Sequence, residues 1–223
     1  MKSSKSSGKV NRAWLHDHVN DPYVKLAQKE GYRARAAYKL MEIDEALHLI
    51  KPGQLVVDLG SSPGAWSQYV QRKLAVSSPH PAHSDGPGAD QVIALDLLPM
   101  EPISGVRFIQ GDFRSDEVLE QLSAALQGQK VDLVLSDMAP NLTGVSVTDA
   151  ARVSLLIELA LAFAQSHLRP DGALVAKVFH SAAYEDLYRQ FSDVFKVVRR
   201  FKPKASRDRS AETFLVGLGL RPV

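Results

Sequence analysis

The stretch LVVDLGSSPGAW, residues 55–66, decides the fold of this chain. An apolar run ends at Asp58 and Leu59, a turn of small residues follows, and a helix-like pattern begins at Trp66. A strand that leads through a glycine-containing turn into a helix is typical of the ligand-binding corner of an open α/β sheet. The turn has neither the Gly-Lys-Ser/Thr of a P-loop nor the three glycines of a dinucleotide fingerprint. It therefore predicts a nucleoside-like ligand without a pyrophosphate, and S-adenosylmethionine is the candidate that fits.

The composition predicts one large domain in a reducing compartment. The 223 residues are 45% hydrophobic, enough for an ordinary core, and none is a cysteine, which excludes disulfides and thiolate metal sites. No apolar run has the length of a transmembrane helix or the pattern of a signal peptide. We expect a flexible basic tail at residues 1–11, a single domain at residues 12–223, and a cytoplasmic monomer with no membrane partner.

Charge is distributed unevenly along the chain. Residues 1–53 carry 10 Lys/Arg and 6 Asp/Glu, residues 54–193 carry 9 and 17, and residues 194–223 carry 8 and 2. The net charges of the three segments are therefore +4, −8 and +6, which agree with the overall value of +2. Basic ends around an acidic middle indicate a polyanion bound by the ends and a cationic cofactor bound by the middle. Ordinary solvated surface is the alternative for either basic run alone.

Strands and helices alternate along the chain, which predicts a Rossmann-like α/β fold with helices on both faces of a mostly parallel, seven-stranded sheet. Residues 12–32 look irregular, and the Pro/Gly-rich segment 77–90 is expected to be a loop outside the fold. A loop joins the last two strands, so the last strand should run antiparallel, as in class I S-adenosylmethionine-dependent methyltransferases. The expected helices are 34–49, 64–75, 115–126, 149–168 (capped by Thr148 or Asp149) and 182–192, and the expected strands are 54–59, 91–96, 106–110, 131–136, 173–179, 194–201 and 212–219.

Charged residues follow several of these strands at the edge where such sheets bind ligands. Asp96, Asp112 and Asp137 come at or after the ends of three strands, and Glu212 begins the antiparallel strand, which puts it on the same edge. Each acid alone has a second explanation, such as helix capping or turn formation. Lys177 is more informative because it lies in the apolar run ALVAKVF, where a lysine is costly unless it is paired. Asp137 ends the neighbouring strand, so a structural ion pair and a catalytic site are both open.

Two other chemistries are disfavoured by the sequence. His16 and His18 are separated by one residue, but no third ligand is evident, so we expect no metal site. The segment MAPN, residues 138–141, contains no aromatic residue that could stack on an extruded base. The absence of such a residue argues against methylation of a base amino group.

Several motifs, in order, resemble the FtsJ/RlmE family of ribosomal RNA methyltransferases. They are DLGSSPGAWSQ at 58–68, DLLPM at 96–100, QGDF at 110–113, SDMAPN at 136–141, KVF at 177–179, and Ser206-Arg207 with Ser210 and Glu212. The match runs from about Arg12 to about Leu220. Ala65 replaces the glycine that is usual in the family, and the segment 77–90 looks longer than usual.

The resemblance implies methylation of the ribose 2′-hydroxyl of a uridine in the A-loop of 23S rRNA, in the large ribosomal subunit, with S-adenosylmethionine as donor. The catalytic tetrad of the family falls on Lys39, Asp137, Lys177 and Glu212. The cofactor-binding positions of the family fall on Gly64, Trp66, Asp96, Asp112 and Asp137. Lys39 enters only through the resemblance, because its own surroundings are those of an ordinary helix lysine.

Two other functions suit the same residues. The tetrad also serves methylation of tRNA or of an mRNA cap, and the fold would also suit a non-catalytic RNA-binding factor in ribosome assembly. A binding module has no need of a buried lysine, so Lys177 favours an enzyme. The basic residues expected to contact RNA phosphates are Lys9, Arg12, Lys25, Lys29, Arg33, Arg35, Lys202, Lys204, Arg207 and Arg209.

Overall fold

The computed structural model describes residues 20–76, 91–140, 146–181, 183–207 and 210–222. The expected tail at 1–11 and the expected loop at 77–90 lie outside the described residues and stay predictions. Lys9, Arg12 and Arg209 also lie outside the described residues, so their expected contacts with RNA stay predictions.

In the described part of the chain, seven strands form one sheet in the order β3-β2-β1-β4-β5-β7-β6. Strand β7 runs antiparallel to both of its neighbours, and the other neighbouring pairs are parallel. The structure therefore confirms the predicted α/β architecture and the antiparallel strand. The strands are β1 (Val56–Leu59), β2 (Val92–Asp96), β3 (Val106–Gln110), β4 (Val131–Ser136), β5 (Leu168–Phe179), β6 (Phe195–Phe201) and β7 (Glu212–Leu220).

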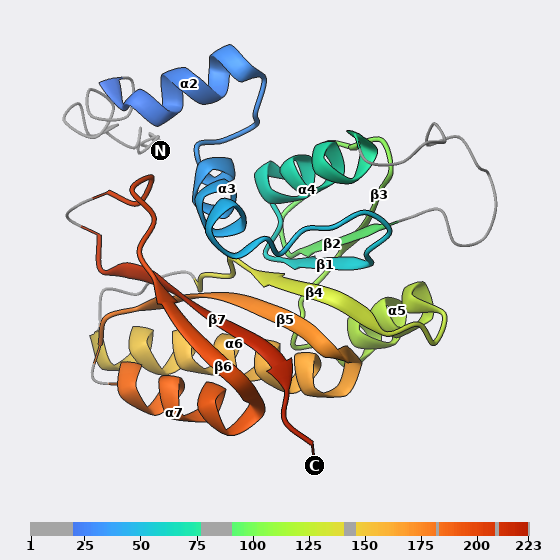
Figure 1. Ribbon diagram of the computed structural model, residues 1–223, viewed down its shortest axis with the longest axis vertical. Helices are drawn as coiled ribbons and strands as arrows, with labels where there is room; N and C mark the ends of the chain where they lie inside the picture. The colour runs from blue at the N-terminus through green and yellow to red at the C-terminus, as the bar shows by residue number, and fades with distance from the viewer. Residues whose placement is uncertain (1–19, 77–90, 141–145, 182, 208–209, 223) are drawn as a thin grey trace, which may run out of the picture.

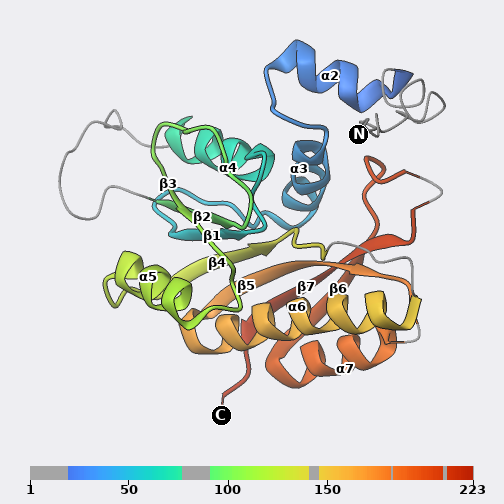
Figure 2. The same cartoon turned by 180° about the vertical axis from the view of Figure 1, so that it is seen from behind.

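Helices cover both faces of the sheet (Figures 1 and 2). Helices α3 (Ala36–Leu47) and α4 (Ala65–Val76) pack on one face, where Leu40, Trp66 and strand residues form a hydrophobic cluster. The other face carries α5 (Asp116–Leu126), α6 (Ser146–His167) and α7 (Tyr184–Val194), whose apolar residues form the larger cluster. The central strands are buried on both sides, as expected for parallel strands between two helix layers. Within the described ranges, no helix has the length and apolar character needed to span a membrane.

The prediction that residues 12–32 are irregular is wrong for part of this region, because Pro22–Glu30 forms helix α2. Its first turn is capped by Asp21, whose carboxylate accepts a hydrogen bond from the Tyr23 amide at 3.0 Å. Pro22 suits the first helical position, and Gly31 ends the helix in the left-handed conformation. Only Ala27 of this helix is buried, so the sequence shows no apolar stripe that would have revealed it.

Two other expected boundaries are also wrong. Helix α6 begins at Ser146, so the expected caps Thr148 and Asp149 lie inside it. Strand β5 begins at Leu168 rather than at residue 173. The extra residues include Pro170, which disfavours a strand assignment in sequence, but the pairing with β4 is irregular between Val131 and Leu133 and accommodates it.

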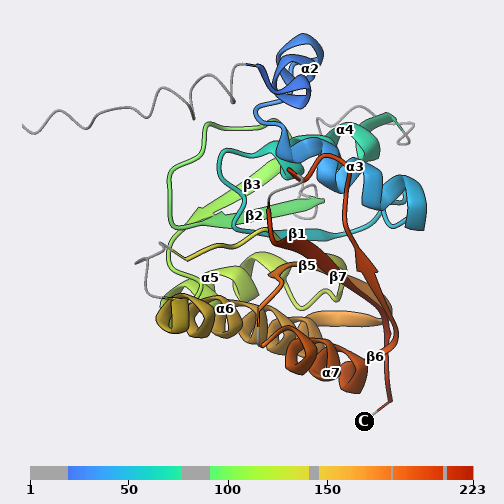
Figure 3. The same cartoon turned by 90° about the vertical axis from the view of Figure 1, so that its left-hand side faces the viewer.

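Helix α2 lies beside the loop that joins β6 to β7, far from it in sequence (Figures 1 and 3). Ala27 of α2 and Ala205 of this loop share a small buried cluster with Tyr38 of α3. Glu42 of α3 holds the loop more directly, because its carboxylate accepts hydrogen bonds from the backbone amides of Lys204 at 2.6 Å and Ala205 at 2.8 Å. The loop before Glu212 is thus fixed to the helix that carries Lys39.

Candidate active site

The turn after β1 forms one wall of a cavity at the carboxyl edge of the sheet. Gly60 has φ of +77°, and a Cβ at this position would lie 2.8 Å from the backbone of Met138 in the turn after β4. Only glycine allows both the conformation and the close approach of the two turns. The Ser62 amide donates to Asp96 Oδ2 at 2.8 Å, and the Leu98 amide donates to Asp96 Oδ1 at 2.8 Å. Asp96 therefore fixes the turn while it faces the cavity.

The cavity has a volume of about 530 Å³. Its wall comes from the turns after the four adjacent strands β1 to β4 and from helix α6. Three of the five expected cofactor-binding residues line it, namely Asp96, Asp112 and Asp137. Apolar side chains make up much of the rest, including the exposed Leu97, Leu98 and Leu155. An apolar cavity with a few carboxylates suits a nucleoside with a positively charged group.

Gly64 and Trp66 are not among the described residues that line this cavity. Trp66 is 2% exposed, its indole N–H donates to the Ala36 carbonyl at 2.8 Å, and its ring packs against Phe214. Gly64 has φ of +100° and packs closely against the side chain of Met100. Their contacts support the turn and the core behind it, so their role in binding the cofactor stays a prediction.

Two buried polar atoms belong to residues close in sequence to Gly60, which lines the cavity. Neither atom has a hydrogen-bond partner among the described residues. They are Asp58 Oδ1, two residues before Gly60, and Ser61 Oγ, directly after it. Burial raises the pKa of Asp58 to about 7, and the nearby carboxylates of Asp137 and Asp96 raise it further. The Ser67 hydroxyl, which donates a hydrogen bond to Asp58 Oδ2 at 2.6 Å, has the opposite effect on this pKa. Neither residue lines the cavity, so these two atoms are buried behind the turn rather than exposed to a ligand.

Asp112 is engaged by Arg114 at the rim of the cavity. The Arg114 guanidinium donates to both carboxylate oxygens, with Nε 2.9 Å from Oδ1 and Nη2 2.6 Å from Oδ2. These hydrogen bonds, with one from the Arg114 amide, lower the pKa of Asp112. Asp112 is therefore held ionised and oriented at the cavity mouth.

Two ion pairs join the members of the expected tetrad at the neighbouring part of the same edge. Lys177 Nζ lies 2.8 Å from Asp137 Oδ1 and donates a hydrogen bond to the Asp137 carbonyl oxygen at 2.7 Å. Lys39 Nζ lies 2.6 Å from Glu212 Oε1. Both lysine side chains are largely buried, with relative exposures of 9% for Lys177 and 14% for Lys39. Asp137 belongs to both sites, because it also lines the cavity.

Glu212 is kept ionised by its neighbours. Burial alone would raise its pKa, but Lys39, Lys177 and the Ser206 hydroxyl outweigh burial, and the pKa is lowered. The Ser206 hydroxyl donates to Glu212 Oε1 at 3.0 Å, the oxygen that also pairs with Lys39. The register of β5 and β7 brings Lys177 close to Glu212, since Lys177 pairs with Phe214 and Phe179 pairs with Glu212. The four charges therefore form one connected group.

Ser206 contacts the tetrad, although the sequence alone assigns it no role. It was noted only as part of a motif, and its value as a donor depends on the β6–β7 loop folding back over Glu212. Asp58 and Ser61 were also left without a firm role, because their unpartnered atoms become visible only in three dimensions. Among the described residues, no group of three His, Asp or Glu side chains is arranged to hold a metal ion.

The order and identity of these residues match a known family model. Residues 32–220 match the model of the FtsJ-like methyltransferases, a span that includes all four members of the tetrad. This chain belongs to the FtsJ-like methyltransferase family. It is 65% identical to the ribosomal RNA large subunit methyltransferase E of Albidiferax ferrireducens, with 100% of each chain covered. It is 62% identical to the protein of that name from Variovorax paradoxus, with 99% of this chain and 98% of the relative covered.

A solved structure shares the fold of this FtsJ-like methyltransferase. A Plasmodium falciparum protein, described as a ribosomal RNA methyltransferase, superposes with a TM-score of 0.70 at 27% sequence identity. The match covers 85% of this chain and 98% of the other. The two chains therefore share one fold over most of their length.

Proposed function

We propose that this FtsJ-like methyltransferase transfers a methyl group from S-adenosylmethionine to the ribose 2′-hydroxyl of a uridine in the A-loop of 23S rRNA. The observation that carries the proposal is the pair of buried ion pairs, Lys177 with Asp137 and Lys39 with Glu212, beside a cavity that shares Asp137. The names of the relatives support a large-subunit ribosomal RNA as substrate. We expect the protein to act as a monomer in the cytoplasm, on the large ribosomal subunit.

The cavity has the chemistry that S-adenosylmethionine needs. Asp96 would accept hydrogen bonds from the ribose hydroxyls, and Asp112 would face the adenine at the rim of the cavity. The methionine ammonium group would lie near the acidic residues of this edge, of which Asp137 lines the cavity and Asp58 is buried behind the turn. When bound, this cofactor supplies an electrophilic methyl group on a positively charged sulfur. Gly64 and Trp66 would contribute to cofactor binding by supporting the turn from behind.

The tetrad would orient the acceptor hydroxyl. An ammonium group paired with a carboxylate donates hydrogen bonds, so Lys177 would hold the hydroxyl oxygen in line for attack. Alignment of this kind contributes several kcal/mol to methyl transfer. Lys39 and Glu212 would fix the position of Lys177 and balance its charge. The hydroxyl proton would pass to solvent as the new C–O bond forms.

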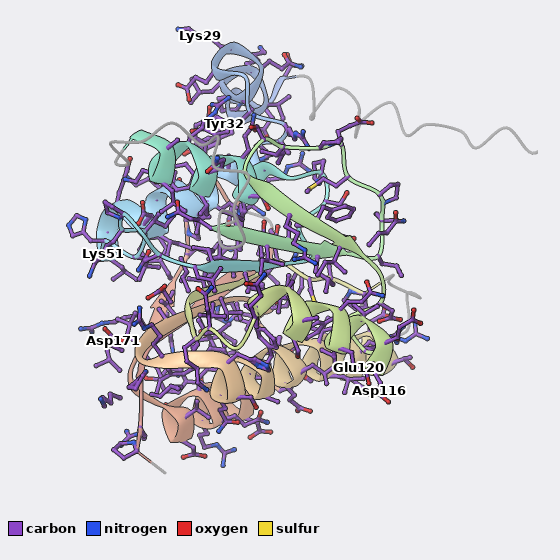
Figure 4. All side chains as sticks on the ribbon, turned by 90° about the vertical axis from the view of Figure 1, so that its right-hand side faces the viewer. Lys29, Tyr32, Lys51, Asp116, Glu120 and Asp171 are labelled. Carbon is purple, nitrogen blue, oxygen red and sulfur yellow. The ribbon has the colours of Figure 1, made fainter. Side chains whose placement is uncertain are left out.

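The RNA would lie across α2 and the β6–β7 loop. Lys25 and Lys29 of α2 and Lys204 of the loop are exposed, and Arg207 is 44% exposed at its side chain. Figure 4 shows Lys29 at the α2 end of the molecule, whereas Asp116 and Glu120 project from α5 on the other side of the sheet. Such a separation of charge would direct a polyanion to the basic side.

Arg33 and Arg35 are poorly available for RNA because contacts within the protein use their guanidinium groups. Arg33 donates to the carbonyls of Pro63 at 3.0 Å and Glu101 at 2.6 Å. Arg35 pairs with Asp21 and donates to the Ala205 carbonyl. We therefore assign these two arginines to the support of the turn and the loop rather than to the RNA surface.

Methyl transfer to isolated large subunits, free 23S rRNA and tRNA tests the proposal. Large subunits from cells that lack this methyl group should accept one methyl each, at a uridine ribose, and tRNA should accept none. The Lys177→Ala variant should lose transfer by at least about a thousandfold while it keeps its affinity for the cofactor.

Lys51→Ala is the matched control, because Lys51 is an exposed lysine before β1, at the opposite edge of the sheet (Figure 4). It should behave like the wild type. Transfer to tRNA alone would assign the substrate to the tRNA alternative. Cofactor binding without transfer to any RNA would favour the non-catalytic factor.

A further inference from the structure

The last residue of β5, Phe179, occupies a position beside the tetrad that its sequence neighbours do not explain. Side chains alternate along a strand, so Phe179 lies on the same face as Lys177 and one step nearer the ligand edge. Across the sheet it pairs directly with Glu212 of β7, which brings the two side chains next to each other. Phe179 therefore borders two members of the tetrad.

The Phe179 ring is half-buried, and it does not belong to the core. The preceding residue, Val178, is 0% exposed and packs in the larger hydrophobic cluster on one face of the sheet. Phe214, which pairs with Lys177, is also 0% exposed and packs in the cluster on the opposite face. In the part of the chain that the structure describes, Phe179 is in none of the three hydrophobic clusters. Its ring centroid lies 6.0 Å from Lys177 Nζ. Packing of the protein alone thus gives no reason for an aromatic ring here.

The chemistry of the acceptor supplies a reason. The 2′-hydroxyl is on the carbon next to C1′, which carries the base, so any ribose whose hydroxyl reaches Lys177 brings a planar base within a few ångströms. We propose that Phe179 stacks on the base of the acceptor nucleotide and holds the ribose over the tetrad. This inference rests on the proposed function, because it takes the acceptor to be a ribose in RNA. Stacking tolerates any base, so Phe179 would position the nucleotide rather than select uracil.

A second role for the ring would be to hold the Lys177 ammonium by a cation–π contact. The distance of 6.0 Å is at the outer limit for such contacts. Lys177 is also already held by the carboxylate and the carbonyl of Asp137. Stacking on the substrate is therefore the stronger interpretation, and the two roles differ in what they predict for the pH dependence of the reaction.

The test compares Phe179→Leu with Phe179→Tyr, with large subunits that lack the methyl group as substrate. Leucine keeps an apolar side chain of similar size but has no ring, and tyrosine keeps the ring. Loss of one stacked base should lower kcat/KM for the subunits about tenfold in Phe179→Leu, while Phe179→Tyr stays within about threefold of the wild type. The affinity for S-adenosylmethionine and the pH profile of kcat should be those of the wild type in both variants. Phe108→Leu, a half-buried phenylalanine on the edge strand β3, controls for general effects of the substitution.

Each outcome bears on the inference. Equal kcat/KM for the leucine and tyrosine variants would overturn it, because the ring would then be irrelevant. A pH profile that shifts in Phe179→Leu would overturn it in favour of a contact with Lys177. If the wild type itself methylates no ribosomal RNA, the proposed function fails first, and that result is separate from any difference among the variants.

Discussion

Replacing Asp58 with asparagine tests whether a buried carboxyl beside the cavity makes folding depend on pH. Asp58 is 0% exposed, and burial raises its pKa from the ordinary value of 3.8 to about 7. The unfolded chain releases this proton near pH 4, whereas the folded protein keeps it until about pH 7. Folding therefore becomes less favourable as pH rises through this window, and above it the full cost remains. Asparagine has the same shape, can accept the hydrogen bond from Ser67, and carries no proton to lose.

The size of the effect follows from the two pKa values. A rise of about three units corresponds to about 4 kcal/mol of destabilisation once the pH is above 7. At pH 5.5 the two values give a cost of about 2 kcal/mol, so about 2 kcal/mol develops between pH 5.5 and pH 8. The free energy of unfolding of Asp58→Asn minus that of the wild type should become more positive by this amount over the same range.

Urea unfolding of both proteins without cofactor, at several pH values from 5.5 to 8, measures this difference. Pairwise comparison cancels the other titrating groups, which are shared by the two proteins. A difference that stays constant within about 0.5 kcal/mol across the range would refute the reasoning, because it would mean that Asp58 titrates alike in the folded and unfolded chains.

Three further substitutions test other parts of the structure. Ser206→Ala removes a hydrogen-bond donor to Glu212, so the pKa of Glu212 should rise. The rate of methyl transfer should fall roughly tenfold, and the acid limb of the pH–rate profile should move to higher pH. An acid limb that does not move would contradict this. Arg33→Ala loses hydrogen bonds to three carbonyls and should lower the free energy of unfolding by about 2–3 kcal/mol. The salt dependence of RNA binding should not change, and a weaker salt dependence would mean that Arg33 contacts RNA phosphates after all. Gly60→Ala places a methyl group against Met138 at positive φ and should cost about 3 kcal/mol in urea unfolding, and a loss below about 1 kcal/mol would show that the two turns can separate.

The convergence of the site on one edge could be predicted from sequence because it depends only on strand direction. Asp96 ends one parallel strand, Asp137 directly follows another, and Glu212 begins an antiparallel one, so all three reach the same edge whatever the details of packing. The association of Lys177 with Asp137 followed in the same way from neighbouring strands. These inferences need periodicity and topology and nothing else.

Other features could not be predicted because they depend on how distant segments pack. Lys39 reaches Glu212 only because α3 lies near β7, and no local pattern encodes where a helix sits on a sheet. The contact of the Trp66 indole with Ala36 likewise depends on α3 and α4 packing together. Helix α2 was missed for a related reason: its cap at Asp21 and its end at Gly31 are visible locally, but it has too few buried residues to show a stripe.

The insertion of β7 between β5 and β6 sets the order in which the two halves of the site can form during synthesis. The cavity is lined by residues from Gly60 to Leu156, all of which are synthesised before β5. A nascent chain that has reached Phe201 has β5 and β6 but lacks the strand that joins them and the carboxylate that pairs with Lys39. The donor half can therefore fold first, and the acceptor half closes only when a strand enters between two that already exist. Such a non-local step is slow in folding, so it separates the ability to bind a cofactor from the ability to use it.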